Sequence, residues 1–344
     1  MVPESMRALV VNDDGYAQGI PPSVPEDLEP FVTADTIPIP QPGRGEVLIK
    51  VRLAPVNPSD VAFILGVYGQ PRVAGKPAGF EAVGDVVSSG GGPFANRLVG
   101  KRVSFYAGVS GSWAEYAVSD ARTCFPLRAG VADADGAGLL INPFSAWAMR
   151  DLVRRSGAQA FIMTAGASQL GKLLVPLAKE SDCRAISLVR RDEHVELMKE
   201  RGAAHALNTT APGFEDALAR VVKDEKPRIL FDALSSPLTH MVFRAMGSHS
   251  RWIVYGGLDY EPSPLPDPGQ FIFRSKRIEG FWLTSWMRNS SVVQMMRAAR
   301  GVQARFISGA WKTDVAAVVP IGEVLSRVPA LLAGANRGKV LIAP

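Results

Sequence analysis

The stretch Thr164-Ala165-Gly166-Ala167-Ser168-Gln169-Leu170-Gly171 decides the fold of this 344-residue chain. It follows an apolar run at 161–163, which predicts a strand, and it precedes a pattern typical of a helix that runs to about Glu180. Small residues in such a turn let backbone N–H groups and the positive helix end approach a pyrophosphate. We therefore expect a dinucleotide site here. Because Ser168 replaces the middle glycine of G-x-G-x-x-G, an ordinary tight turn is the alternative.

The strand that follows this helix ends in two arginines. Residues 185–189 form an apolar run, and Arg190 and Arg191 come directly after it, roughly twenty residues beyond the glycine turn. A site for NAD usually has an acidic residue at this place, whereas a cationic side chain suits the 2′-phosphate of NADPH. The two arginines therefore favour NADPH. The alternative is that they only begin the charged face of a helix at 192–201.

Two kinds of domain are expected along the chain. The middle continues with a strand at 229–232, a helical stretch at 237–246 and a strand at 252–255, and this alternation predicts a doubly wound parallel sheet. The first third instead has short strand candidates between glycine and proline clusters, which predicts a mainly β domain. The fold class is thus α/β. A final strand at 339–342 is expected to return to the first domain, which would place a ligand cleft between the two domains.

Composition excludes several classes of protein. The net charge of +5 is spread along the chain without a basic block, so it gives little support for a nucleic-acid partner. No uncharged apolar stretch reaches about eighteen residues, which argues against a membrane span. Cys124 and Cys183 are too few and too unpatterned for a disulfide framework or a structural zinc site. Together with the lack of a secretion signal, this indicates a cytoplasmic protein.

The sequence resembles the medium-chain dehydrogenase/reductase superfamily. The resemblance is carried, in order along nearly the whole chain, by residues 57–60, 66–69, 79–87, 111–116, 142–143, 164–171, 255–257 and 338–340. Within this superfamily, residues 188–191 and 277–283 look most like mitochondrial-type 2-enoyl thioester reductases, with zinc-free quinone oxidoreductases next.

The resemblance implies a GroES-like, mainly β catalytic domain and a Rossmann domain that binds NADPH. The expected boundaries are 1–126, completed by 289–344, for the first domain and 127–288 for the second. Zinc-dependent relatives carry a histidine before the glutamate of a G-H-E motif, but this chain has Phe80 before Glu81. Phenylalanine cannot bind zinc, so no metal is expected. Glu81 is expected to be a buried structural carboxylate paired with an arginine.

Without a metal, another group must stabilise the enolate that forms when hydride reaches the β-carbon of an enoyl thioester or an enone. Tyr68 matches the tyrosine of the enoyl reductases, and its neutral phenol can donate a hydrogen bond. Its alternative role is that of a packing residue on the site wall. Asn57 is expected to orient Tyr68 or to bind the nicotinamide ribose, and an Asx turn before Pro58 is an alternative that does not exclude this.

The remaining family positions are expected to contact the cofactor. Backbone N–H groups of the turn would meet the pyrophosphate, Tyr255 and Gly256 would line the adenosine or nicotinamide side, and Phe281 and Leu283 would meet the carboxamide through main-chain atoms. Trp282 and Trp286 are candidates for a dimer interface or an acyl pocket. The full set of expected cofactor residues is Asn142, Ala165, Gly166, Ser168, Gln169, Leu170, Gly171, Arg190, Arg191, Tyr255, Gly256, Phe281 and Leu283.

Two classes of function follow. The first is a zinc-independent, NADPH-dependent reductase of an activated carbon–carbon double bond, with an enoyl thioester as the expected substrate and a quinone or an enone as the alternative. The second is a catalytically silent NADPH-binding protein that acts as a sensor or binds RNA or a partner. Tyr68 and Asn57 together favour the enzyme, because a pure binding protein does not need both. A small-molecule substrate and a homodimer are the expected partners, without nucleic acid or membrane.

Overall fold

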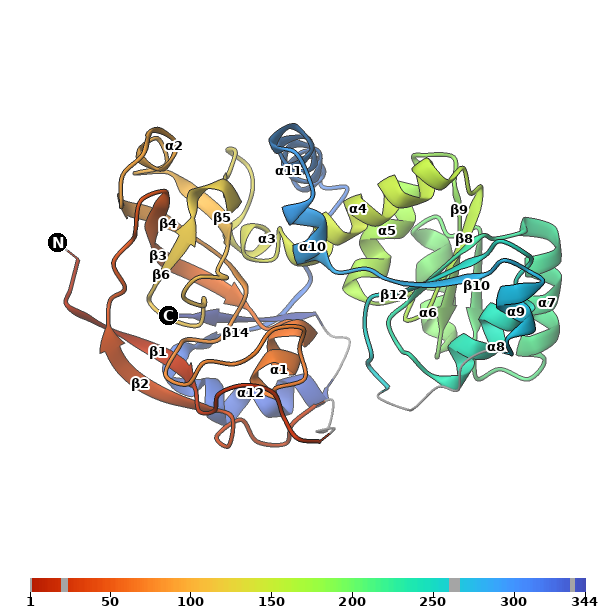
Figure 1. The fold of residues 1–344 in the computed structure, drawn as a ribbon, viewed down its shortest axis with the longest axis horizontal. Helices are drawn as coiled ribbons and strands as arrows, with labels where there is room; N and C mark the ends of the chain where they lie inside the picture. Colours follow the sequence, from red (N-terminus) through yellow and green to blue (C-terminus); the bar gives the residue numbers. More distant parts are fainter. Residues whose placement is uncertain (1, 20–23, 260–266, 335–337) are drawn as a thin grey trace. The chain divides into compact units, whose positions relative to one another are not determined.

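The computed structural model describes residues 2–19, 24–259, 267–334 and 338–344, and its contacts divide the chain into two units. Unit 1 combines residues 1–141 with residues 299–344, and unit 2 is Asn142–Ala298. Both ends of the chain therefore belong to unit 1 (Figure 1). The boundaries lie at 141/142 and 298/299, later in the chain than the expected 126/127 and 288/289. The first boundary lies later because residues 127–141 pack on unit 1, where Glu81 accepts hydrogen bonds from the N–H groups of Leu140 and Ile141.

Unit 1 is built on a mainly antiparallel sheet. Its seven strands follow the order β14-β15-β3-β4-β5-β7, with β6 also paired to β3, and β1 and β2 form a separate antiparallel pair. The C-terminal strand β15 pairs with β3, so the final strand lies in unit 1, the return to the first domain that the sequence predicts. The elements are β1 (Ser5–Val11), β2 (Val32–Pro38), β3 (Glu46–Pro55), α1 (Pro58–Ile64), β4 (Glu81–Ser89), α2 (Pro93–Asn96), β5 (Arg102–Tyr106), β6 (Tyr116–Asp120), η1 (Ala121–Thr123), β7 (Cys124–Pro126), α3 (Asp133–Ala137), β14 (Val315–Pro320), η2 (Ile321–Glu323), α12 (Val324–Ala333) and β15 (Lys339–Ala343).

Unit 2 is a doubly wound parallel sheet. Its strand order is β10-β9-β8-β11-β12-β13, and every neighbouring pair is parallel. The elements are α4 (Ile141–Ser156), β8 (Ala160–Met163), α5 (Gln169–Lys179), β9 (Arg184–Val189), α6 (Asp192–Glu200), β10 (His205–Asn208), α7 (Phe214–Glu225), β11 (Ile229–Asp232), α8 (Pro237–Ala245), β12 (Arg251–Val254), α9 (Gly269–Ile272), β13 (Arg277–Gly280), α10 (Leu283–Arg288) and α11 (Val292–Ile307). The first residue of α4 and the second half of α11 belong to unit 1.

The local sequence explains the central strands of unit 2. Strands β8 and β11 are continuous apolar runs whose residues are all buried, as expected of parallel strands with both faces covered. Helix α5 buries Leu170, Leu173, Leu174 and Leu177, the spacing of one helical face. The strand order reverses between β8 and β11. In such sheets ligands bind beyond the carboxyl ends of the strands at this reversal, so the turn after β8 is placed to hold one.

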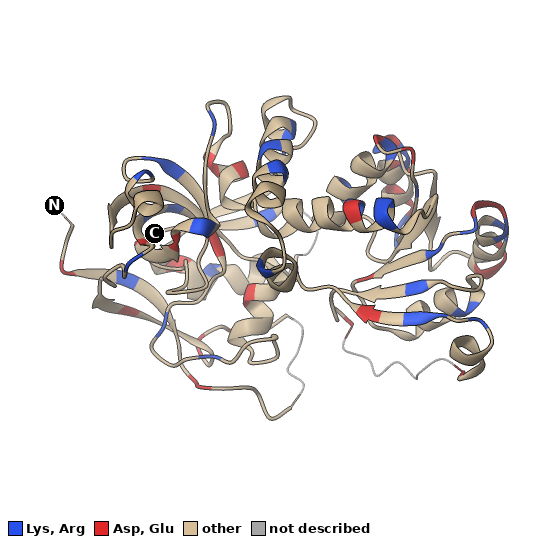
Figure 2. Cartoon of the chain, turned by 45° about the horizontal axis from the view of Figure 1, so that its top comes forward, with Lys and Arg blue, Asp and Glu red and all other residues tan. Residues whose placement is uncertain are grey.

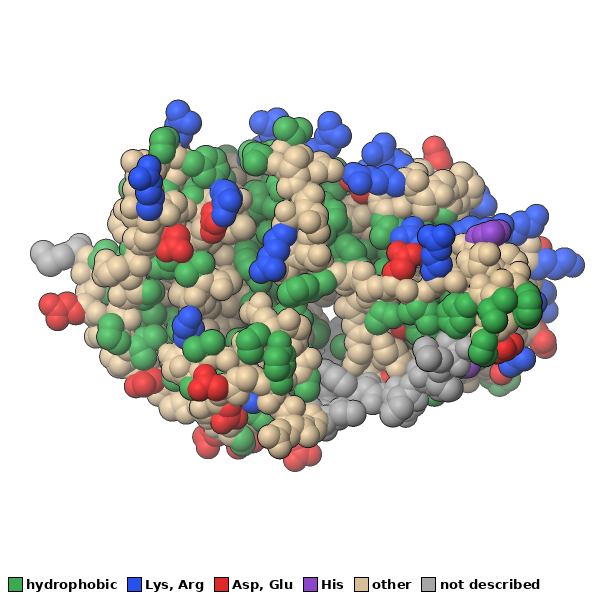
Figure 3. All heavy atoms as spheres, viewed as in Figure 1, with side chains coloured by type: hydrophobic (Ala, Val, Ile, Leu, Met, Phe, Trp, Pro, Cys, Tyr) green, Lys and Arg blue, Asp and Glu red, His purple; other side chains and the backbone are tan. Residues whose placement is uncertain are grey.

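Charge and surface polarity are mixed in both units. Figure 2 shows acidic and basic residues interspersed along the elements of each unit, and Figure 3 shows hydrophobic side chains between them at the surface. In unit 2 the most exposed large hydrophobic residues include Phe273 at 84% and Ile272 at 68%. In the part of the chain that the structure describes, no helix is both long and apolar enough to cross a membrane.

Candidate functional site

The turn from β8 packs closely against the first turn of α5. Ser168 caps α5, and its hydroxyl accepts a hydrogen bond from the N–H of Gly171 at 3.3 Å. A Cβ added to Gly171 would lie 1.9 Å from the carbonyl oxygen of Gly166, so the helix approaches the turn more closely than any other residue permits. Within the described residues, the N–H groups of Gln169 and Leu170 have no acceptor. These free donors at the positive end of a helix fit a phosphate.

A buried polar network fixes the ends of the two central strands. Thr164 follows β8, and its hydroxyl donates to Asp232 Oδ1 at the end of β11 over 2.7 Å. Asp232 also accepts from the Thr239 hydroxyl at 2.9 Å and from Trp252 Nε1 at 3.0 Å. Two backbone N–H groups, those of Leu234 and Ser235, complete its partners. The network holds both strand ends at the point where the strand order reverses.

The two arginines after β9 have different surroundings. Arg191 forms an ion pair with Glu193 at 3.3 Å, and both side chains are largely exposed. Arg190 is also exposed, but among the residues described its guanidinium takes part in no hydrogen bond or ion pair. Its carbonyl oxygen accepts from the Thr210 hydroxyl at 3.4 Å. Arg190 is therefore the cation at this strand end that remains available to an anionic ligand.

The other expected cofactor residues lie at the ends of elements in unit 2. Tyr255 and Gly256 follow β12, and the Tyr255 N–H donates to the Asp232 carbonyl oxygen at 2.9 Å. Burial raises the pKa of Tyr255, with a further contribution from the Asp232 carboxylate. Phe281 follows β13, and because its N–H donates to Val254, its carbonyl oxygen is the main-chain group left for a ligand. Two more expected residues lie at helix starts: Leu283 begins α10, and Asn142 is the second residue of α4.

Unit 1 holds a buried cluster of charged and polar side chains around Asn57. The Asn57 amide donates to Glu81 Oε1 at 2.9 Å and accepts a hydrogen bond from Lys339 Nζ. Asp60 accepts the N–H groups of Asn57 at 2.7 Å and of Phe80 at 2.9 Å. Asn57, Asp60, Glu81 and Lys339 are each at most 8% exposed. Glu81 is thus buried as expected, but the cation of its cluster is Lys339, not an arginine.

Burial dominates the electrostatics of this cluster. It raises the pKa of Asp60 to about 7, and the neighbouring Glu81 charge acts in the same direction. Burial also raises the pKa of Glu81 and lowers that of Lys339, while the attraction between these two charges opposes both shifts. Three ionisable groups therefore share one enclosed space. None of the three was a candidate for catalysis from sequence, although the Asn-Pro-Ser-Asp run at 57–60 has the spacing of a helix cap.

Tyr68 lies in the loop that follows α1. It is half-buried, and its ring packs on Phe80 with centroids 5.0 Å apart and ring planes 35° apart. Phe80 itself is 3% exposed. The amide of Asn57, at the start of α1, is bonded to Glu81 and Lys339, whereas Tyr68 contacts Phe80 beyond the end of α1. The two expected catalytic residues are thus linked through α1 and the residues 80–81.

The position expected for a zinc-binding histidine holds the ring of Phe80. Over residues 2–19, 24–259, 267–334 and 338–344, no group of three or more His, Cys, Asp or Glu residues is arranged to hold a metal ion. A phenylalanine ring that packs against Tyr68 therefore stands where zinc-dependent relatives are expected to carry a metal ligand.

Comparisons with known proteins identify the family of the chain. The family model described as an alcohol dehydrogenase GroES-like domain matches residues 43–129, and the model described as a zinc-binding dehydrogenase matches residues 170–298. The solved structure of a candidate NADPH:quinone reductase from Mesorhizobium loti is 50% identical, with a TM-score of 0.95 and full coverage of both chains.

Two curated relatives are more distant. Prostaglandin reductase-3 from Bos taurus is 26% identical, over 83% of this chain and 74% of the relative. A mitochondrial enoyl-[acyl-carrier-protein] reductase from Dictyostelium discoideum is also 26% identical, over 70% of each chain. The chain therefore belongs to the zinc-free branch of the medium-chain dehydrogenase/reductase superfamily. It is an oxidoreductase of the nicotinamide-dependent type.

Proposed function

We propose that this protein is a zinc-independent, NADPH-dependent reductase of a carbon–carbon double bond conjugated to a thioester carbonyl, of the trans-2-enoyl-CoA or acyl-carrier-protein type. The observation that carries the proposal is the Tyr68 ring packed against Phe80, the residue at the position where zinc-dependent relatives are expected to carry a metal ligand. The relationship to a mitochondrial enoyl-[acyl-carrier-protein] reductase supports this substrate class.

The residues of the chain divide the work of this reaction. When bound, NADPH supplies a hydride, which adds to the β-carbon of the double bond. The Tyr68 hydroxyl donates a hydrogen bond to the thioester oxygen, which becomes the negatively charged enolate oxygen as the new C–H bond forms. The enolate then takes a proton at its α-carbon, from Tyr68 with replacement from water or from water directly. Asn57 holds the start of α1, and thereby the position of the Tyr68 loop.

The residues of unit 2 fit the cofactor. The free N–H groups of Gln169 and Leu170 would bind the pyrophosphate, and the Arg190 guanidinium would bind the 2′-phosphate. The similar Mesorhizobium loti protein carries NADPH in its name, which supports the same cofactor here. Cys124 and Cys183 are both free thiols, which fits the reducing conditions of the cytoplasm.

A quinone or an enone is the second candidate substrate. The 50% identity to a candidate NADPH:quinone reductase favours a quinone, and the relationship to prostaglandin reductase-3 favours an enone. Turnover of crotonyl-CoA, a benzoquinone and a simple enone, each with NADPH and with NADH, separates these candidates. Turnover of crotonyl-CoA with the highest kcat/KM supports the proposal. Turnover of the quinone or enone alone replaces it with the second candidate, and no turnover of any substrate contradicts both.

Tyr68→Phe tests the role of the hydroxyl. The substitution removes one hydrogen-bond donor and keeps the ring on Phe80, so folding and NADPH binding should be unchanged. We expect kcat to fall roughly a hundred- to a thousandfold, because the substrate oxygen gains its charge in the transition state. Stopped-flow measurement of NADPH oxidation with crotonyl-CoA gives this rate. An unchanged kcat would show that Tyr68 is a packing residue.

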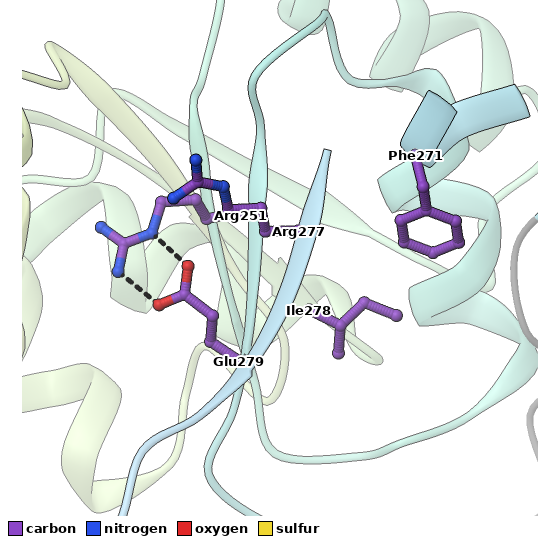
Figure 4. A pocket seen from close by; sticks show the side chains of 5 residues that line it. All are labelled: Arg251, Phe271, Arg277, Ile278 and Glu279. Atoms are coloured by element: carbon purple, nitrogen blue, oxygen red, sulfur yellow. Dashed lines mark hydrogen bonds and ion pairs between the residues drawn. The ribbon is translucent and has the colours of Figure 1, made fainter. Parts of the chain in front are cut away.

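We further propose a homodimer that forms through strand β13. This strand ends the sheet of unit 2, and the residues beside it line a surface hollow of about 840 Å³ (Figure 4). Figure 4 shows Arg251, Arg277 and Glu279 on one side of the strand, and Ile278 on the other side toward Phe271. An open strand edge flanked by apolar and charged side chains is suited to pairing with a second copy.

A further inference from the structure

Phe80 lies at the centre of a group of aromatic rings in unit 1. Its ring centroid is 5.0 Å from that of Tyr68, 5.1 Å from that of Phe63 and 6.2 Å from that of Tyr106. The Tyr106 ring is inclined to it by 15° and is stacked, whereas the Tyr68 and Phe63 rings are tilted to it by 35° and 59°. We call these four residues the Phe80 cluster. In it, Phe80 touches the two rings that carry hydroxyl groups.

The backbone of Phe80 is fixed on both sides. Its N–H donates to Asp60 Oδ1 at 2.9 Å, and its carbonyl oxygen accepts from the N–H of Ala107 at 2.7 Å. The preceding Gly79 has φ = +87°, and a Cβ there would lie 2.4 Å from Ser112 Oγ and from a ring carbon of Trp113. Gly79 thus has a backbone conformation that favours glycine, and any side chain at this position would collide with Ser112 and Trp113. The backbone that carries the Phe80 ring is therefore fixed.

Tyr68 lies between two anchored points of its loop and contacts the fixed Phe80 ring. The loop after α1 is anchored before Tyr68, where the N–H of Val67 donates to Ala62, and after it, where Arg72 is buried and donates to Ile64. Tyr68 itself is only half-buried. The close contact with the Phe80 ring therefore restricts the orientation of the phenol ring, and with it the direction in which its hydroxyl points.

We propose that Phe80 is the positioning residue of the candidate reaction, because its buried ring fixes the direction of the Tyr68 hydroxyl. The proposal rests on the proposed role of Tyr68. Phe80 stands where zinc-dependent relatives are expected to carry a zinc-binding histidine. In the proposed site this position supplies no metal ligand, and its ring instead orients the Tyr68 hydroxyl that takes over the role of the metal. Asp60 completes the arrangement, because it joins the Phe80 backbone to the first turn of α1, the helix that leads into the Tyr68 loop.

The inference is tested by a double-mutant cycle on kcat with crotonyl-CoA and NADPH. The proteins are the wild type, Phe80→Leu, Tyr68→Phe and the double variant. We expect Phe80→Leu to lower kcat roughly ten- to a hundredfold, with little change in KM or in the Kd for NADPH, because a misdirected donor affects the transition state. In the double variant, kcat should equal that of Tyr68→Phe alone. A ring that acts only through the hydroxyl has no effect once the hydroxyl is absent.

Phe63→Leu is the matched control. Phe63 is 9% exposed and packs on the same Phe80 ring, but no ring contact joins it to Tyr68 in the described chain. The control should keep kcat within about twofold of the wild type. Phe80→Met provides a second variant of nearly preserved volume in case Phe80→Leu does not fold, and thermal unfolding checks each protein.

The outcomes separate the inference from the function on which it rests. No turnover of crotonyl-CoA by the wild type overturns the proposed function, whereas an unchanged kcat in Tyr68→Phe overturns the role of Tyr68, and the inference with it. If Tyr68→Phe is slow but the effect of the Phe80 variant is absent, or multiplies with that of Tyr68→Phe, the role of Tyr68 stands and the positioning role of Phe80 is overturned. An equal loss in Phe63→Leu assigns the effect to packing and likewise overturns the inference.

Discussion

Arg190 is an exposed cation directly after β9, and it differs from its neighbour because its guanidinium has no partner in the described part of the chain. We predict that Arg190→Ala raises the Kd for NADPH roughly ten- to a hundredfold and leaves the Kd for NADH unchanged, because a guanidinium forms strong charge-assisted bonds with a phosphate. Arg191→Ala is the matched control, since Arg191 is already paired with Glu193. Calorimetric titration of both cofactors measures the effect. Equal affinity of the wild type for NADPH and NADH would contradict the assignment.

Asp60 makes the stability of the protein depend on pH. Its pKa rises from 3.8 to about 7 on folding, chiefly through burial. Between these pH values the folded protein holds a proton that the unfolded chain has released, so this contribution to stability is present at low pH and is lost as the pH rises to about 7. We predict that the Tm of the wild type falls, relative to that of Asp60→Asn, between pH 4 and 7. Parallel Tm profiles for the two proteins would refute the prediction.

Single residues of the site could be predicted from sequence only where a local motif marks them. Tyr68 and Asn57 lie in short runs that resemble a known family, and the family itself is confirmed. The partner of Asn57 could not be predicted in this way. Lys339 is 282 positions away along the chain, and only the pairing of β15 with β3 brings it to Asn57. Lys339 is also far from Glu81 along the chain, so the sequence does not predict that the cation beside Glu81 is this lysine and not an arginine.

At the scale of elements, the joint between β8 and α5 is sensitive to substitution. A Cβ at Gly171 would lie 1.9 Å from the Gly166 carbonyl oxygen, a backbone atom that cannot turn away. We predict that Gly171→Ala lowers the free energy of unfolding by roughly 1–3 kcal/mol and weakens NADPH binding, because α5 must move away from the turn. Gly322→Ala is the control, since a Cβ there meets nothing within 4 Å. Urea unfolding of both variants provides the comparison, and equal losses would exclude a special role for this joint.

The regular elements of unit 2 follow from local sequence better than those of unit 1. Strands β8, β9, β11 and β12 are short apolar runs, and the structure has them within a residue or two of the expected bounds. The pair β1 and β2 was not expected. Five of the seven residues of β2 are exposed, so its apolar pattern is weak, and the strand exists because it pairs with β1 along its whole length. Such pairing is a property of two distant segments and leaves little signal in either.

At the scale of the whole molecule, the division into two units depends on contacts that local composition does not reveal. Helix α3 packs on β3, β4 and β5, and the residues after it bind Glu81. The sequence changes character near residue 126, at the end of β7, but the chain leaves unit 1 only at Ile141. The boundary is therefore set by a buried carboxylate and its hydrogen bonds, and a change in composition is an imprecise guide to it.

The assembly of the molecule depends on which open sheet edge is used. Strands β13 and β14 both end their sheets and both carry exposed apolar residues, Ile278 at 37% and Val318 at 48%. The β13 edge has in addition the highly exposed Phe273 and the hollow beside Arg277 and Glu279. If two copies pair antiparallel about Ile278, Arg277 of each copy lies opposite Glu279 of the other, so the edge is complementary to itself.

We therefore predict that Ile278→Lys raises the dissociation constant of the dimer at least roughly tenfold, because it places a charge at the centre of the strand pairing. Val318→Lys makes the same change on the β14 edge and should leave the mass unchanged. Light scattering over a dilution series measures the mass of both variants and of the wild type. A monomeric wild type would remove the proposed dimer. Dissociation by Val318→Lys alone would move the interface to unit 1, where it would depend on β14 and β15, the strand that also delivers Lys339 to Asn57.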